Sequence, residues 1–305
     1  MLKTTSSTLL GKFVMVFVFV LFVAFAPVET KLEKLKREIK GELGKQEGTF
    51  AVAFKNIRTG EELLLNERET FHAASTMKTP VMIEVFKQAS EGRFSLADSV
   101  IIKNEFKSIV DGSPFHLNET DDSEFTLYKN LGKKRTISEL VYDMIIVSSN
   151  LATNIIIELV DAKKVTTTMR SLGANDIVVL RGVEDSKAFA LGLNNTVTAY
   201  DHLMIFEKIA KGEVVSPTAS AAMTKILFDQ KFNTIIPARL PKDVKVAHKT
   251  GWINGLHHDA GIVYLPDGRT YILVLLSKNL KDEKSGIEAM ASVSEMVYKY
   301  VIDGK

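Results

Sequence analysis

The sequence predicts an α+β fold in which one antiparallel sheet is built from both ends of the chain and helices form the middle. Strand-like stretches occur at 49–65 and at 244–277, whereas residues 75 to about 220 have mostly helical apolar spacing. This order predicts one domain, residues 27–305, with a sheet lobe (27–74 and 235–305) and a helical lobe (75–234). We expect a ligand site in the cleft between the lobes, because both contribute side chains there.

The predicted sheet lobe begins with an amphipathic helix at Thr30–Leu43. Its apolar residues share one face: Leu32, Leu35, Ile39 and Leu43. A β-hairpin follows, with strands at Thr49–Lys55 and Glu61–Leu65. In the C-terminal part we expect strands at Val244–Lys249, Asp259–Leu265 and Thr270–Ser277, a turn at Pro266-Asp267-Gly268, and a closing helix at Glu283–Val301. These segments supply the sheet and the two terminal helices that flank it.

The helical lobe starts with the helix-like run after Ser75. Thr136-Ile137-Ser138-Glu139 resembles a capping box, in which the threonine and glutamate side chains satisfy the first backbone N–H groups of a helix at Leu140–Val147. Further helices are expected at Asn150–Val160, Thr198–Lys211 and Ala219–Phe228. The segment from about Lys103 to Lys134 has no readable pattern.

The N-terminal segment has the pattern of an export signal. Lys3 and Lys12 precede an apolar run at Phe13–Ala26, and Ala24-Phe25-Ala26 is typical of a cleavage site. Fourteen apolar residues suit a signal-peptide core better than a membrane span. Pro27 would directly follow the cut and disfavours it, so retention as a membrane anchor is the alternative. We expect a periplasmic or extracellular protein with a signal peptide at residues 1–26.

Composition excludes several classes of function. The 305 residues carry a net charge of +2, which provides no basic field for nucleic acid, and cysteine is absent. No disulfide, thiol nucleophile or cysteine-based zinc site is therefore possible. We expect no cofactor, no metal and no nucleic-acid partner, and a monomer that acts on a small molecule.

Three short motifs supply the groups of one active site. They are Ser75-Thr76-Met77-Lys78, Ser148-Ser149-Asn150 and Lys249-Thr250-Gly251. A serine hydroxyl is a weak nucleophile at neutral pH and needs an adjacent base. Lys78 stands one helical turn after Ser75, and it can accept a proton only if burial or a neighbouring cation such as Lys249 lowers its pKa. The first and third motifs also have bland interpretations: Ser75 as a helix cap, Lys78 as a solvated lysine, and His248-Lys249-Thr250 as the end of an edge strand.

Together the ordered motifs resemble those of the penicillin-recognising serine hydrolases, and most closely the class A serine β-lactamases. The resemblance implies a β-lactamase-like fold and a Ser75 acyl-enzyme, with Lys78 taking or relaying the serine proton and Ser148 passing a proton to the departing nitrogen. Asn150 would orient Lys78 and bind a substrate amide. Lys249 and Thr250 would hold the substrate carboxylate, and the N–H groups of Ser75 and of Trp252, directly after Gly251, would hold the oxyanion.

The set of residues for hydrolysis of the acyl-enzyme is less complete than the three motifs. The resemblance implies a glutamate that activates water, and Glu184 is the candidate, with Asp185 as the rival base. Class A enzymes have an asparagine four residues later, where this chain has Ala188. Asn194 or Asn195 could substitute for it after a rearrangement of the loop. The middle residue of the second motif departs as well, because Ser149 stands where the family usually has aspartate.

Other sites are disfavoured by pattern. His257-His258-Asp259 lacks the H-E-x-x-H metal motif, and adjacent strand residues face opposite sides. No G-x-S-x-G elbow and no phosphate-binding glycine loop occur. The leading prediction is an exported serine hydrolase that opens β-lactam rings. The alternatives are a D-alanyl-D-alanine peptidase or penicillin-binding protein, a penicillin sensor, and an esterase on the same scaffold.

Overall fold

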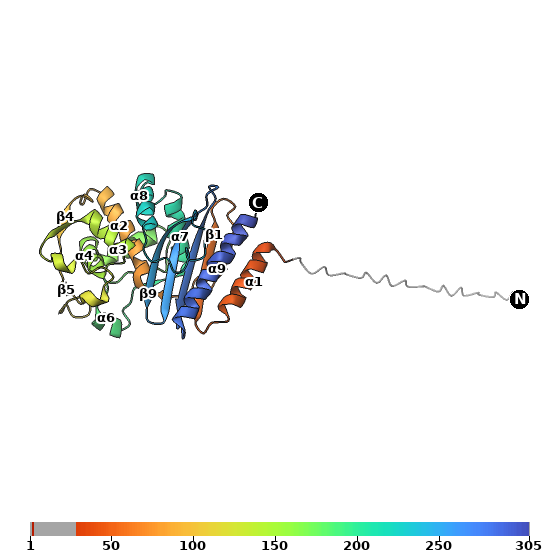
Figure 1. Cartoon of the computed structure of the whole chain (residues 1–305), viewed down its shortest axis with the longest axis horizontal. Helices are drawn as coiled ribbons and strands as arrows, with labels where there is room; N and C mark the ends of the chain where they lie inside the picture. Colours follow the sequence, from red (N-terminus) through yellow and green to blue (C-terminus); the bar gives the residue numbers. More distant parts are fainter. Residues whose placement is uncertain (1, 3–28, 305) are drawn as a thin grey trace.

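A five-stranded antiparallel sheet forms the centre of the molecule (Figure 1). The computed structural model describes residue 2 and residues 29–304, so the predicted signal peptide and its cleavage site after Ala26 lie outside the described residues, apart from residue 2. The strand order is β2-β1-β11-β10-β9. The strands are β1 (Thr49–Asn56), β2 (Glu62–Leu65), β9 (Lys245–Ile253), β10 (Leu256–Tyr264) and β11 (Thr270–Lys278). Both ends of the chain therefore contribute to one sheet, as predicted.

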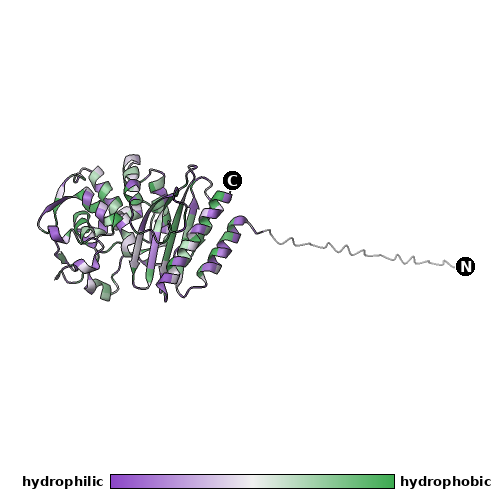
Figure 2. Ribbon diagram, viewed as in Figure 1, coloured by the Kyte–Doolittle hydropathy of each residue, from purple (hydrophilic) through white to green (hydrophobic). Residues whose placement is uncertain are grey.

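Helices α1 (Lys31–Leu43) and α9 (Glu283–Asp303) lie side by side over one face of this sheet (Figure 1). Alternation along β1 separates two apolar cores: Phe50, Val52 and Phe54 join the core under α1 and α9, whereas Ala51 and Ala53 face the helical lobe. Figure 2 shows mainly hydrophobic residues along the central strands and hydrophilic residues along the outer helices. The sheet is thus buried on both faces.

The remaining helices cover the other face of the sheet and extend into a helical lobe. They are α2 (Lys78–Ser90), α3 (Ile137–Ile146), α4 (Asn150–Val160), α5 (Ala162–Ser171), α6 (Ser186–Ala190), α7 (Ala199–Ala210) and α8 (Pro217–Phe228). Three two-stranded ribbons accompany them: β3 (Phe71–His72) with β8 (Thr196–Val197), β4 (Ser99–Ile101) with β7 (Lys134–Thr136), and β5 (Phe106–Lys107) with β6 (Pro114–Phe115). The predicted α+β fold class is confirmed.

Local signals account for several of the boundaries. Thr136 caps α3 through a capping box with Glu139, as predicted, and Thr30 caps α1 in the same way with Glu33, which was not predicted. The β1–β2 hairpin and helix α4 also lie where the sequence places them. Strands β9 and β10 are longer than predicted, because the chain reverses at Asn254-Gly255, a dipeptide typical of hairpin turns. Helices α5 and α6 were not predicted.

The unreadable segment 103–134 contains no long element. It forms the β5–β6 ribbon and two single turns of 3₁₀ helix, η2 (Glu119–Asp121) and η3 (Tyr128–Asn130). Side chains rather than regular backbone pairing hold it, as with Asn104, which bonds the backbone of Leu117 in both directions. Within the described part of the chain, no helix has the length and apolar character needed to cross a membrane.

Candidate active site

Ser75 lies in a single 3₁₀ turn, η1 (Ala74–Met77), which leads directly into α2 at Lys78. Neither η1 nor α2 has a side-chain cap, so Ser75 is not the ordinary helix cap of the bland interpretation. Pro80 is tolerated because it stands in the first turn of α2, where backbone N–H groups need no partner in the helix. The turn presents Ser75 to a cavity of about 300 Å³ between the two lobes.

Lys78 is fully buried beneath this cavity. Its Nζ donates to the Ser148 carbonyl at 2.7 Å, to Ser148 Oγ at 3.2 Å and to Asn150 Oδ1 at 2.9 Å. Burial lowers the Lys78 pKa to about 7, against the opposing charges of Asp122 and Glu184. A large fraction of this lysine is therefore neutral at pH 7, which a proton acceptor requires.

Ser148 lies between two lysines. Its Oγ accepts from Lys78 and also from Lys249 Nζ at 3.1 Å. Lys249 is 0% exposed, and its pKa is well below the usual range because of burial and the charge of Lys78. The bland interpretations are wrong, because Lys78 is buried rather than solvated and Lys249 lies within β9 rather than at its end. The structure instead joins the three motifs into one hydrogen-bonded chain that can pass a proton.

Strand β9 runs alongside the Ser75 turn, and Gly251 makes this approach possible. A Cβ at position 251 would lie 2.9 Å from Ser75 N and 3.0 Å from Thr76 N, closer than real side chains come. Thr250 is buried, whereas Trp252 is 63% exposed and forms a wall of the cavity. The glycine of the third motif therefore sets how closely Trp252 and Ser75 approach one another.

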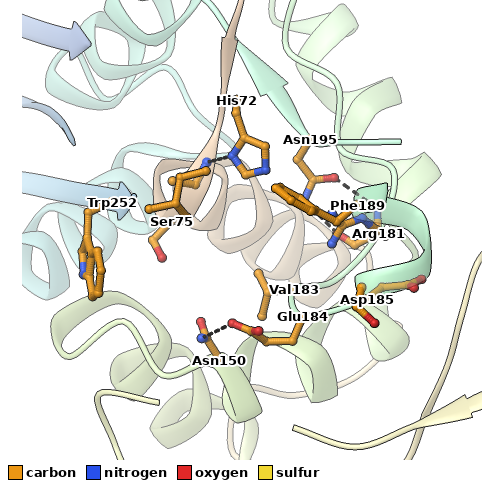
Figure 3. A pocket seen from close by; sticks show the side chains of 13 residues that line it. His72, Ser75, Asn150, Arg181, Val183, Glu184, Asp185, Phe189, Asn195 and Trp252 are labelled. Carbon is orange, nitrogen blue, oxygen red and sulfur yellow. Dashed lines mark hydrogen bonds between the residues drawn. The ribbon is translucent and has the colours of Figure 1, made fainter. Parts of the chain in front are cut away.

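Glu184 reaches the cavity from the side opposite Ser75 and Trp252 (Figure 3). Its Oε1 accepts a hydrogen bond from Asn150 Nδ2 at 3.1 Å. Burial raises the Glu184 pKa, and the nearby Asp121 raises it further. Asn150 therefore joins Lys78, through its oxygen, to Glu184, through its amide nitrogen.

The loop that carries Glu184 is fastened through its backbone. Asn154 Oδ1 accepts from Val183 N at 2.7 Å, and Asn154 Nδ2 donates to Val183 O at 3.0 Å. Gly182 is required here, since a Cβ at this position would lie 2.2 Å from Asn154 Oδ1. Asn195 closes the neck of the loop by bonding the backbone N–H and carbonyl of Arg181.

Asp185, the rival base, points away from the cavity (Figure 3). Its carboxylate accepts from Ser108 Oγ and Ile109 N, each at 3.0 Å, and from Ala188 N at 3.1 Å. Asn194 and Asn195 are likewise engaged with Arg181, so either would replace the missing asparagine beside Glu184 only after a rearrangement of this loop.

Two residues near the site were missed by sequence reasoning. His72 lines the cavity, and its Nδ1 accepts from Ala74 N at 3.0 Å; burial and the Arg181 charge lower its pKa. Asp122 accepts from the backbone N–H groups of Asn150 and Leu151, at 2.9 and 2.8 Å. His72 lies three residues before Ser75, which is a usable signal, but no pattern in the sequence identifies Asp122.

The histidine pair of β10 has structural partners. His257 Nε2 lies 2.8 Å from Glu283 Oε2, and the Nε2 of the buried His258 lies 2.9 Å from the His72 carbonyl. In the described ranges, no group of three or more histidine, cysteine, aspartate or glutamate residues is placed to hold a metal ion.

Comparison with known proteins agrees with this geometry. The model of the beta-lactamase enzyme family matches residues 34–301. The extended-spectrum beta-lactamase PER-1 of Pseudomonas aeruginosa is 25% identical over 296 residues, which cover 92% of each chain. The beta-lactamase VEB-1 of the same organism is 22% identical over 297 residues, with 93% of this chain and 95% of that protein covered.

Solved structures show the same fold. PBP-A has a TM-score of 0.77 at 28% identity, with 91% of this chain and 99% of that chain covered. A beta-lactamase from Sphaerobacter thermophilus has a TM-score of 0.75 at 24% identity, with 87% and 96% covered. The family match over nearly all of the described chain, joined to this constellation of serine and lysine motifs, shows that the protein belongs to the beta-lactamase enzyme family as a hydrolase of the class A type.

Proposed function

We propose that this enzyme hydrolyses β-lactams through an acyl-enzyme on Ser75. The observation that carries the proposal is the buried chain Lys78–Ser148–Lys249, which lies beneath the cavity that Ser75 lines. It supplies a lysine with a pKa of about 7, a hydroxyl relay and a second buried lysine. An acyl-enzyme complex with penicillin G is known for a variant of the similar protein PBP-A, which supports the same chemistry here.

In the acylation step, Ser75 Oγ forms a bond to the lactam carbonyl carbon, and the ring C–N bond breaks. Neutral Lys78 takes the Ser75 proton and passes it to Ser148, which gives its own proton to the departing nitrogen. The N–H groups of Ser75 and Trp252 hold the oxyanion, while Lys249 and Thr250 attract the substrate carboxylate. In this proposal, each bond change is therefore assigned to a named group.

In the second step, Glu184 takes a proton from the water that attacks the ester carbonyl carbon, and this proton returns to Ser75 Oγ as the ester C–O bond breaks. The hydrogen bond from Asn150 orients the Glu184 carboxylate, and burial raises the pKa of that carboxylate, which makes its ionised form a better proton acceptor. Ala188 gives this water no side-chain amide. This departure favours one second candidate, a penicillin-binding protein that is acylated but hydrolyses the ester slowly.

The test is to mix the purified protein with a chromogenic cephalosporin and to follow absorbance and intact mass together. Sustained colour with only a transient mass increase on the protein supports hydrolysis. One equivalent of colour followed by a mass increase that persists for hours supports the second candidate. No colour and no adduct would contradict both, and turnover of simple esters under those conditions would favour an esterase.

We further propose that the chain is exported, that it acts as a monomer and that it needs no metal or nucleic acid. Export is supported by the sequence pattern at residues 1–26. The mass of the mature protein in culture fractions tests cleavage after Ala26 against retention as an anchor. Gel filtration tests the monomer, and activity in excess chelator tests independence from metals.

A further inference from the structure

The carboxylate of Asp122 lies at the N-terminus of α4, directly behind the second motif. Its Oδ2 accepts from Asn150 N at 2.9 Å, from Leu151 N at 2.8 Å and from Ser149 Oγ at 3.4 Å. Backbone N–H groups at a helix start have no partner within the helix, and the helix dipole favours an anion there. Asp122 therefore fixes the turn from which both Ser148 and Asn150 project.

Contacts within the segment 103–134 also hold the Asp122 side chain in place. Tyr128, a buried residue of η3, donates its hydroxyl to Asp122 Oδ2 at 3.0 Å, and Glu124 N donates to Oδ1 at 3.1 Å. Both oxygens of the carboxylate are thus engaged. The segment 103–134 has little regular structure, yet it delivers one well-fixed carboxylate to the active site.

The turn needs such support because its backbone is strained. Ser148 has a φ of +59°, a conformation that residues other than glycine rarely adopt and that persists only where neighbouring contacts impose it. Lys78 binds the Ser148 carbonyl, the Ser148 hydroxyl and Asn150 Oδ1, so all its hydrogen bonds depend on this turn. A shift of the turn would move each acceptor of the lysine at once.

We propose that Asp122 is a positioning residue for acylation, which holds the Ser148-Ser149-Asn150 turn against Lys78 from outside the three motifs. Ser149 cannot supply this charge. It is fully buried, and its hydroxyl caps α4 by accepting from Ala152 N at 3.2 Å. The carboxylate at this turn comes instead from a different part of the chain, 27 positions earlier. This inference rests on the proposed acylation of Ser75.

The charge of Asp122 also acts on Lys78. The charged groups that face Lys78 are Asp122, Glu184 and Lys249, from three different segments. An anion near a lysine favours its protonated form, so Asp122 keeps the Lys78 pKa higher than burial alone would. Removing the charge should lower that pKa further.

The test is Asp122→Asn, with the acylation rate by a fluorescent penicillin measured from pH 5 to pH 9. The limiting rate at high pH should fall by roughly 10- to 100-fold, the loss expected when a catalytic group is misplaced. The pH at which the rate is half-maximal should move to lower pH. The Lys78 titration in the resting enzyme, followed by NMR of carbon-labelled lysine, should move in the same direction. Glu119→Gln removes an exposed carboxylate of the same segment and should change none of these quantities.

A charge exchange separates positioning from simple stability. Ser149→Asp alone should slow acylation, because it places two carboxylates together. Combined with Asp122→Asn, the same substitution returns one carboxylate to the turn and should speed acylation relative to Asp122→Asn. If Asp122→Asn does not fold, this double variant and Tyr128→Phe, which removes only one hydrogen bond to Asp122, supply the measurement.

The inference would be overturned if Asp122→Asn folds and keeps both the wild-type acylation rate and the wild-type Lys78 titration. It would also be overturned if Ser149→Asp changed the acylation rate by the same factor in the wild type and in Asp122→Asn. A wild-type protein that forms no adduct would contradict the proposed function instead. In that case the NMR titration still reports whether Asp122 acts on Lys78.

Discussion

The groups proposed for acylation and the group proposed for deacylation are held in different ways. Lys78, Ser148 and Lys249 come from α2, the turn before α4 and β9, and hydrogen bonds join them into one buried chain. Glu184 stands on a loop and shares one hydrogen bond with that chain, through Asn150. The acylation groups are therefore held together by a buried chain of hydrogen bonds, whereas the position of Glu184 depends on the contacts that hold one loop.

This difference indicates which residues can change the function with the least disturbance of the fold. Moving a lysine of the acylation half would disturb two lobes at once, because each lysine is fully buried. Changing residues around Glu184 disturbs only the loop, whose backbone is held separately by Asn154 and Asn195. Turnover can thus change while acylation is kept, which is the distinction between a β-lactamase and a penicillin-binding protein.

The largest effect is expected for Ser75→Ala, which removes the nucleophile. Covalent labelling by a fluorescent penicillin should be abolished, and the melting curve by circular dichroism should stay close to that of the wild type, because Ser75 caps no helix. Labelling of the folded variant would place the nucleophile elsewhere and would remove the basis for both halves of the comparison.

Lys78→Ala should slow acylation by roughly 10²–10⁴-fold, as expected when a general base is lost. In the wild type the reactive form is the neutral lysine, so the acylation rate should rise with pH through about 7, the pKa of Lys78. Stopped-flow labelling across this range measures both quantities. A flat wild-type profile between pH 6 and pH 8 would show that Lys78 is not the base.

Glu184→Gln should affect only the second half of the reaction. The amide keeps the shape of the side chain but cannot take a proton at neutral pH, so the acylation burst should persist while hydrolysis slows by roughly 10²–10⁴-fold. Intact-mass spectra should then show the trapped acyl-enzyme. Equal slowing of burst and turnover would mean that Glu184 also serves acylation.

Lys249→Ala should weaken substrate capture, with an effect of a few kcal/mol at most for one charged contact. Acylation by lactams that carry a carboxylate should fall more than acylation by neutral esters, measured as kcat/KM for each. Equal losses for the two substrates would assign Lys249 to the proton relay through Ser148 instead of to the substrate carboxylate.

Sequence reasoning identified the fold because the fold depends on local patterns. A strand-like run predicted β1, an apolar helical stripe predicted α1 and a capping box predicted α3, and each of these is a short-range signal. The three motifs were recognisable for the same reason, because the residues of each motif lie close together in the sequence. Their assembly into one site follows from the sheet topology, which brings β9 beside the Ser75 turn.

The remainder of the site depends on contacts between distant segments. Nothing near Asp122 in the sequence indicates that its carboxylate meets the start of α4, because the segment around it has no period to read. The partners of Asp185 are equally remote, in the loop at Ser108 and Ile109. Sequence alone left Glu184 and Asp185 as competing bases, and the direction of the two side chains favours Glu184.

The smallest effect on chemistry is expected for Asp185→Asn, which tests the fastening of the loop. Burial raises the Asp185 pKa, but hydrogen bonds from the Ala188 and Ile109 N–H groups and the Ser108 hydroxyl outweigh it and hold the pKa below its ordinary value of 3.8. A carboxylate with a depressed pKa stabilises the fold at pH values above that ordinary value, and this contribution is lost as the pH falls through the folded-state pKa.

The Asp185→Asn variant should therefore be about 1–3 kcal/mol less stable than the wild type at pH 7, with a smaller difference near pH 3. Denaturant unfolding at the two pH values measures this, and acyl-enzyme hydrolysis should stay within roughly tenfold of the wild type, since a positioning loss is smaller than the loss of the base itself. A variant of normal stability that accumulates acyl-enzyme would instead make Asp185 the base and reverse the assignment of this loop.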